Sequence, residues 1–139
     1  MPASTPSGAR KSPFRALLTY AAVGAAGTAA QYVVLFALLH AGLAQAPVAS
    51  ALGAVVGAIV NYFLNHAITF SGQASHRDAL PRFALIALLG AVFSYLAMKG
   101  IMAWGGVPVL LAQLVVTAAL LVLTFAANAL WSFRRVARP

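Results

Sequence analysis

The stretch VASALGAVVGAIVNYFLNHAITF, residues 48–70, contains no Lys, Arg, Asp or Glu. At the ~1.5 Å rise per residue of a helix, a segment of this length crosses the roughly 30 Å hydrocarbon layer of a bilayer. Backbone groups inside lipid must form hydrogen bonds within their own segment, so the stretch predicts a transmembrane helix. Two amides, on Asn61 and Asn65, lie near its C-terminal end. Their presence in so apolar a segment makes them candidates for a function.

The composition of the whole chain indicates the same class of protein. Its 139 residues are 63% hydrophobic and 7% charged, with a mean hydropathy of +0.92. In a soluble domain about a quarter of the residues are charged. Three further apolar stretches, at residues 17–39, 83–104 and 109–133, have the length of about 20 residues that a membrane span needs. The sequence therefore predicts an all-α integral membrane protein with four transmembrane helices.

The distribution of Lys and Arg predicts the orientation of these helices. The connections at residues 41–46 and 105–107 contain no basic residue. Because short cytoplasmic segments carry an excess of positive charge, both termini are predicted to be cytoplasmic. Residues 1–13 are predicted to be a flexible cytoplasmic tail, and residues 14–135 the transmembrane domain. The net charge of +8 thus reflects topology rather than nucleic-acid binding. The basic residues at the predicted cytoplasmic side are Arg10, Lys11, Arg15, Arg77, Arg82, Arg134, Arg135 and Arg138.

An internal repeat divides the domain into two halves. The repeats extend over about residues 17–72 and 80–135. Each contains two predicted helices, so both halves enter the membrane from the same side. The sequence predicts two parallel helix-pair repeats, related by an axis along the membrane normal. A shift of 63 residues without gaps places identical residues in register: Gly27 on Gly90, Tyr32 on Tyr95, Gly42 on Gly105, Asn65 on Asn128, and Phe70 on Phe133.

The end of the second apolar stretch resembles a known family. The segment NYFLNH, residues 61–66, followed by Thr69 and Phe70, is similar to the signature of the GtrA-like membrane proteins. These also form the membrane domain of some dolichol-phosphate mannose synthases, and the resemblance covers roughly residues 14–135. It implies flipping of a polyprenyl-phosphate-linked sugar, such as an undecaprenyl-phosphate sugar, across the bacterial cytoplasmic membrane for polysaccharide or glycolipid synthesis. It also implies a membrane glycosyltransferase partner on the cytoplasmic side.

Two interpretations of Asn61 and Asn65 are open. Residues four apart lie on one face of a helix, and this face continues through Gly57 and Gly53 to Ala49. Small residues at this spacing allow close helix packing, and an amide adds an interhelical hydrogen bond. The amides are therefore predicted either to join helices or to line a polar groove for a sugar or phosphate. The Gly53–Gly57 row also predicts a homodimer, since four helices alone make a thin wall around a sugar pathway.

Polar residues occur at several depths of the predicted membrane. With the predicted topology, Gln31 and Lys99 lie in the outer half of the bilayer and Asn61 lies near its middle. Asn65 and Asn128 lie in the inner half. This distribution predicts either a stepwise path for a headgroup or scattered amides that only hold the helices together.

Lys99 is an ionisable residue inside the third span, where a charge is costly and therefore a candidate for function. The single acid of the chain, Asp78, lies in the predicted inner loop and cannot pair with it. Lys99 is predicted either to extend its ammonium group to the outer interface at Trp104, or to contact the phosphate of an anionic lipid. Tyr95, one turn earlier, would contact the sugar or orient the ammonium group. The candidate substrate-binding residues are Lys99, Tyr95, Gln31, Asn61, Asn65 and Asn128.

The sequence lacks the parts of an enzyme active site. It has no carboxylate pair, no cysteine and no Gly-rich phosphate loop, so neither catalytic residues nor a cofactor are predicted. His40, His66 and His76 have no second ligand at metal-binding spacing, so no metal site is predicted. Three functions remain: a translocase for a lipid-linked sugar, a non-transporting anchor or scaffold for a polyprenyl-phosphate glycosyltransferase, and a small drug exporter. The exporter ranks last, because proton-coupled cation export needs a membrane carboxylate.

Overall fold

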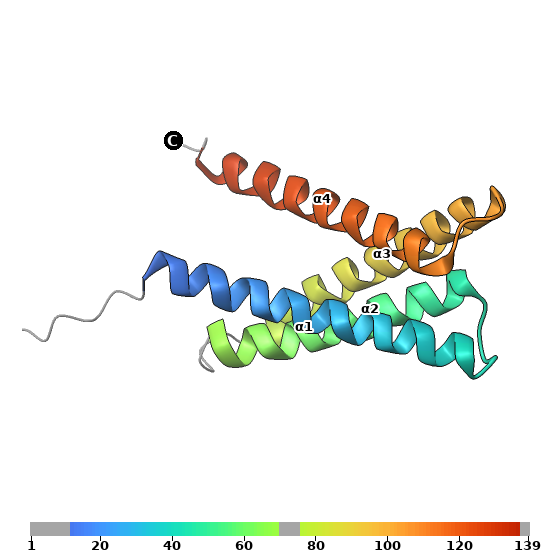
Figure 1. Ribbon diagram of the computed structural model, residues 1–139. Helices are drawn as coiled ribbons and strands as arrows, with labels where there is room; N and C mark the ends of the chain where they lie inside the picture. The colour runs from blue at the N-terminus through green and yellow to red at the C-terminus, as the bar shows by residue number, and fades with distance from the viewer. Residues whose placement is uncertain (1–11, 70–75, 137–139) are drawn as a thin grey trace, which may run out of the picture.

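The computed structural model describes residues 12–69 and 76–136, and the regular structure within these residues is helical. Most of the predicted N-terminal tail, residues 1–11, lies outside the described residues. The prediction of an all-α fold is confirmed. The helices are α1 (Pro13–His40), α2 (Ala46–Thr69), α3 (His76–Ala103) and α4 (Val109–Val136) (Figure 1).

Glycine shapes the turns that follow α1 and α3. Gly42 and Gly105 have φ angles of +67° and +75°, in the region that residues with a Cβ rarely adopt. After α1, the N–H of Gly42 donates to the carbonyl of Leu39 at 3.1 Å, and the N–H of Leu43 donates to the carbonyl of Leu38 at 3.0 Å. This pair of bonds is the Schellman arrangement that ends many helices. The two turns therefore need glycine at positions 63 residues apart.

Three helices within the described residues are long and apolar enough to span a membrane: Pro13–His40, Ala46–Ile68 and Leu80–Ala103. In α4 the apolar stretch among the described residues is Val109–Thr124, so the fourth span stays a prediction. Exposed Leu and Val side chains occur on all four helices. Such wide apolar surface is rare in soluble monomers and suits a surrounding of lipid.

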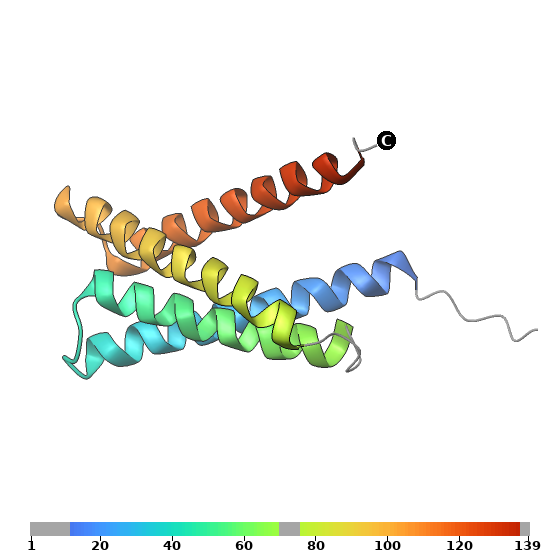
Figure 2. The ribbon, with the colours of Figure 1, turned by 180° about the vertical axis from the view of Figure 1, so that it is seen from behind.

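The helices form a bundle that is closed at one end and splayed at the other. α1 and α2 lie side by side and antiparallel, and α3 packs on α2 (Figures 1 and 2). α4 meets α3 near their connecting turn and then diverges from α1 (Figure 1). We call the end with the α1–α2 and α3–α4 turns the turn end, and the end where α1 begins and α4 finishes the terminal end. The apolar core of Met98, Ala112 and Val116 lies toward the turn end.

The row of Gly53 and Gly57 brings α2 against α1 of the same chain. A Cβ on Gly53 would lie 2.6 Å from the carbonyl oxygen of Gln31, and a Cβ on Gly57 would lie 2.7 Å from that of Gly27. Such close backbone contact is what small residues four apart permit. The row predicted to join two copies is therefore occupied by α1 of the same chain and is not free for a second copy, while the homodimer itself stays a prediction.

Buried positions also recur at the 63-residue spacing. Leu35 and Met98, which are 63 residues apart, are both 0% exposed. Ala49 and Ala112 are a second fully buried pair. Ser50 and the equivalent Gln113 are a third, although both are polar. The correspondence between the two halves of the sequence thus extends to burial at these positions.

Candidate functional site

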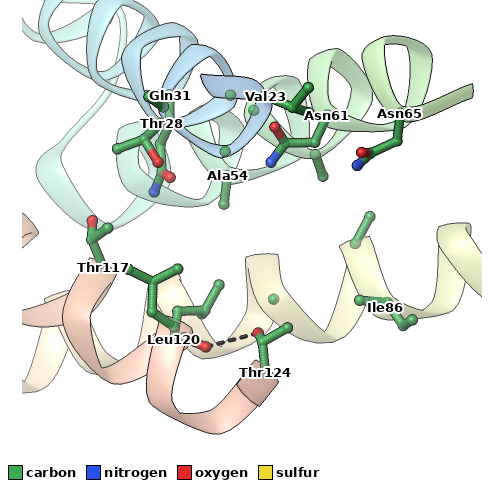
Figure 3. Close-up of a pocket in the computed structure, with 18 of the residues that line it drawn as sticks. Val23, Thr28, Gln31, Ala54, Asn61, Asn65, Ile86, Thr117, Leu120 and Thr124 are labelled. Carbon is green, nitrogen blue, oxygen red and sulfur yellow. Dashed lines mark hydrogen bonds between the residues drawn. The ribbon is translucent and has the colours of Figure 1, made fainter. Parts of the chain in front are cut away.

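A cavity of about 480 Å³ lies between the α1–α2 pair and the α3–α4 pair (Figure 3). The helices converge on the core near the turn end and α4 diverges from there, so space is left between them. Small and aliphatic residues form most of the lining, and none of the described lining residues carries a formal charge. All four helices also contribute polar side chains: Thr28, Gln31, Asn61, Asn65, Ser94, Thr117 and Thr124.

Asn61 reaches the cavity from the close contact between α1 and α2. Its side chain lies over Gly27, where any added Cβ would overlap the amide. The half-buried amide points from α2 into the cavity (Figure 3). The Oδ1 atom is buried and accepts no hydrogen bond from the described residues. An unpaired buried polar atom costs about 1–3 kcal/mol, and this oxygen packs against Gly27, so a ligand hydroxyl or water would relieve the cost only by reaching it.

Ser94, which lines the cavity from α3, has a second unpaired and buried oxygen. The residue is 0% exposed, and its Oγ has no hydrogen-bond partner within residues 12–69 and 76–136. A hydroxyl both donates and accepts, as do the hydroxyls of a sugar. Ser94 is 63 residues from Gln31, which lines the cavity from α1. Equivalent positions of the two halves thus contribute polar groups to the same space.

A hydrogen-bonded network joins α1, α2 and α4 on the turn-end side of the cavity. The buried Ser50 Oγ donates to Gln113 Oε1 at 2.7 Å, and a longer contact of 3.4 Å links Gln113 Nε2 to Thr117 Oγ1. The Tyr32 hydroxyl lies 3.0 Å from the same Thr117 oxygen. Ser50 and Gln113 are repeat-equivalent residues that bond each other directly. Because Thr117 also lines the cavity, the network closes the space toward the turn end.

Comparison with known proteins decides the family. A sequence model of the GtrA/DPMS transmembrane domain matches residues 19–133. The chain belongs to the GtrA/DPMS transmembrane-domain family. Searches of curated proteins and of solved structures give no significant match. As a GtrA/DPMS family member, the protein is a multi-pass membrane protein, and its family is associated with sugar-lipid processes in membranes.

The cavity of this GtrA/DPMS protein brings together Gln31, Asn61 and Asn65 of the predicted site residues. All three labelled side chains lie along one wall, formed by α1 and α2 (Figure 3). Lys99 and Tyr95 do not line the cavity. Lys99 is exposed on α3, with its Nζ 5.8 Å from the centroid of the Tyr95 ring. The side chain of the sixth predicted residue, Asn128, lies outside the part that the structure describes.

Polar groups that sequence reasoning missed complete the opposite wall. Thr117 and Thr124 come from α4, and Thr124 Oγ1 donates to the Leu120 carbonyl at 2.7 Å (Figure 3). Ser94 adds to this wall from α3. A threonine or serine that bonds its own helix is common in membrane helices, so residue type alone does not single these out. The available signal was the repeat, since the shift of 63 residues aligns Gln31 with Ser94.

Proposed function

We propose that this protein moves a polyprenyl-phosphate-linked sugar across the bacterial cytoplasmic membrane for cell-surface polysaccharide or glycolipid synthesis. The observation that carries the proposal is an uncharged cavity inside a lipid-exposed bundle, to which all four helices contribute polar side chains, with unpaired buried oxygens on Asn61 and Ser94. The chain also belongs to a family associated with sugar-lipid processes in membranes, and this membership supports the same function.

The size and chemistry of the cavity suit a sugar headgroup. Its volume of about 480 Å³ falls within the ~300–1,000 Å³ of ordinary small-molecule sites. Amide and hydroxyl groups can pair with the hydroxyls of a sugar without charge. A headgroup would therefore exchange hydrogen bonds with water for hydrogen bonds with the protein as it enters.

The shape of the bundle supports an arrangement that is open toward the cytoplasm. In the predicted topology the splayed terminal end is cytoplasmic, and the Ser50–Gln113 network closes the outer side. We infer that the two parallel helix pairs move relative to each other about an axis near Ser50 and Gln113. A direct bond between repeat-equivalent residues is expected close to a two-fold axis, and parallel repeats move in this way in other transporters.

A non-transporting scaffold is the second candidate function. Exposed Arg15, Arg77 and Arg82 lie near the terminal end and could hold an acidic region of a glycosyltransferase on the cytoplasmic side. A scaffold needs this surface but does not need a cavity with polar side chains inside the membrane. The cavity therefore favours the translocase.

Transport by the isolated protein separates the two functions. Purified protein is reconstituted into liposomes that contain a fluorescent polyprenyl-phosphate sugar and no glycosyltransferase. A translocase makes the fluorophore on both leaflets accessible to an external quencher, whereas a scaffold leaves half of it protected. Protein-free liposomes are the control, and protection equal to that control would contradict the proposal.

A further inference from the structure

A groove between α1 and α4 adjoins the cavity. This second hollow has a volume of about 560 Å³. α1 contributes Ala25, Ala29 and Tyr32 to its walls, and α4 contributes Leu114, Ala118 and Leu121. The alanines and leucines among these are exposed. The groove therefore opens from the interior of the bundle toward the surrounding lipid.

The groove and the cavity share part of their lining. Ala25, Thr28, Thr117 and Leu121 belong to both hollows, so the two hollows adjoin at these residues. Tyr32 and Thr117 join α1 to α4 by their hydroxyl contact at 3.0 Å on the turn-end side. Toward the terminal end, the described residues form no further hydrogen bond between these two helices, and α4 diverges from α1 (Figure 1). The groove is thus fixed at one end and open along its side.

The volume of the cavity limits what part of a lipid it can hold. A space of about 480 Å³ has the size of a site for a drug-sized ligand, so it accepts a sugar but not a long polyprenyl chain as well. The chain is apolar and gains nothing by leaving the hydrocarbon. The hydrocarbon chain of a lipid whose headgroup lies in the cavity must therefore leave through a side opening with an apolar lining.

We propose that the α1–α4 groove is a lateral portal that binds the hydrocarbon chain of the lipid whose headgroup lies in the cavity. The proposal rests on the proposed function, because it takes the ligand to be a polyprenyl lipid. Thr28 and Thr117 lie where the two hollows meet, and so at the junction between the polar head and the apolar chain. Apolar alanine and leucine side chains then follow the chain outward to the membrane.

Photo-crosslinking tests the portal independently of transport. The probe is polyprenyl phosphate without sugar, with a diazirine in the isoprene units next to the phosphate, mixed with the full-length protein in nanodiscs. Peptide mass spectrometry locates the adducts. We expect adducts on residues 25–32 and 114–121, about tenfold above those on Leu85 and Leu89, which are exposed on α3 outside both hollows.

Two tryptophan variants fill the groove from either side. Ala29→Trp and Ala118→Trp are each expected to lower the selective labelling about tenfold. The matched control is Ala37→Trp, on the same helix as Ala29, exposed, and outside both hollows. It is expected to label like the wild type. Use of both variants keeps the test valid when one of them does not fold.

The outcomes distinguish this inference from the proposed function. Equal labelling of the groove and of Leu85 and Leu89 would overturn the portal, and so would adducts between two protein chains across the groove, which would show that a second copy occupies it. If transport of the lipid-linked sugar is then still observed, only the portal fails. Selective groove labelling in a protein that does not transport supports the portal and rejects translocation.

Discussion

The contact between α1 and α2 gives a prediction whose size follows from two distances. Gly57→Ala would place a Cβ 2.7 Å from the carbonyl oxygen of Gly27, and Gly53→Ala would place one 2.6 Å from that of Gln31. Carbon and carbonyl oxygen normally approach to about 3.3–3.6 Å, so the helices must separate by roughly 0.5–1 Å. The closest atoms are backbone carbonyl oxygens, which cannot move aside as the end of a flexible side chain can.

The expected cost of Gly57→Ala is that of an overpacked core, about 1–3 kcal/mol in the free energy of unfolding. Replacing glycine by alanine inside a helix recovers about 0.5–1 kcal/mol. Gly100→Ala on α3 is the matched control, because a Cβ there meets no atom within 4 Å. Gly100→Ala has only the stabilisation from placing alanine in a helix. The difference in unfolding free energy between the two variants therefore measures the cost of the close contact alone.

Denaturant unfolding of both variants in mixed micelles measures this difference. We expect Gly57→Ala to be less stable than Gly100→Ala by about 1–3 kcal/mol. Equal stability would show that α1 and α2 do not approach as closely as described. That result would also remove the contact that directs Asn61 into the cavity.

Further predictions concern the polar residues. Asn65→Leu combined with Asn128→Leu should leave a folded, inserted protein that fails to support glycan modification; degradation or loss of assembly would instead assign these amides to packing, where each contributes roughly 0.6–2 kcal/mol. Lys99→Arg should keep part of the transport activity and Lys99→Met should abolish it, because a lone cation can contact a lipid phosphate; wild-type transport by Lys99→Met at equal protein level would reject this role. Ser50→Ala should lower the unfolding free energy by about 1–3 kcal/mol, since it leaves Gln113 Oε1 buried without its donor, and unchanged stability in the same unfolding assay would contradict the network.

Helix content was predictable because it depends on local properties. Apolar length and the placement of basic residues define the helices, and the spacing of four between Asn61 and Asn65 places both on one face, which lines the cavity. Gln31 was identified as a polar residue in an apolar span, and it lines the same cavity.

Packing partners were not predictable in the same way. A row such as Gly53–Gly57 fits a helix of the same chain as well as one from a second copy, and only the structure shows α1 against it. The unpaired hydroxyl of Ser94 likewise depends on what surrounds it. The position of Lys99 on the outside of α3 could not be derived either, because helix rotation within the bundle is set by contacts among all four helices.

Transport by a variant that removes both unpaired cavity oxygens tests the central claim most directly. Asn61→Leu combined with Ser94→Ala removes two polar groups without breaking any hydrogen bond among the described residues, so folding should be retained. Thr19→Val is the control, because it removes an exposed hydroxyl that bonds only the Arg15 carbonyl, outside the cavity. In liposomes with a fluorescent polyprenyl-phosphate sugar, we expect the double variant to lose transport and the control to keep it. Wild-type transport by the folded double variant would contradict passage of the headgroup through this cavity.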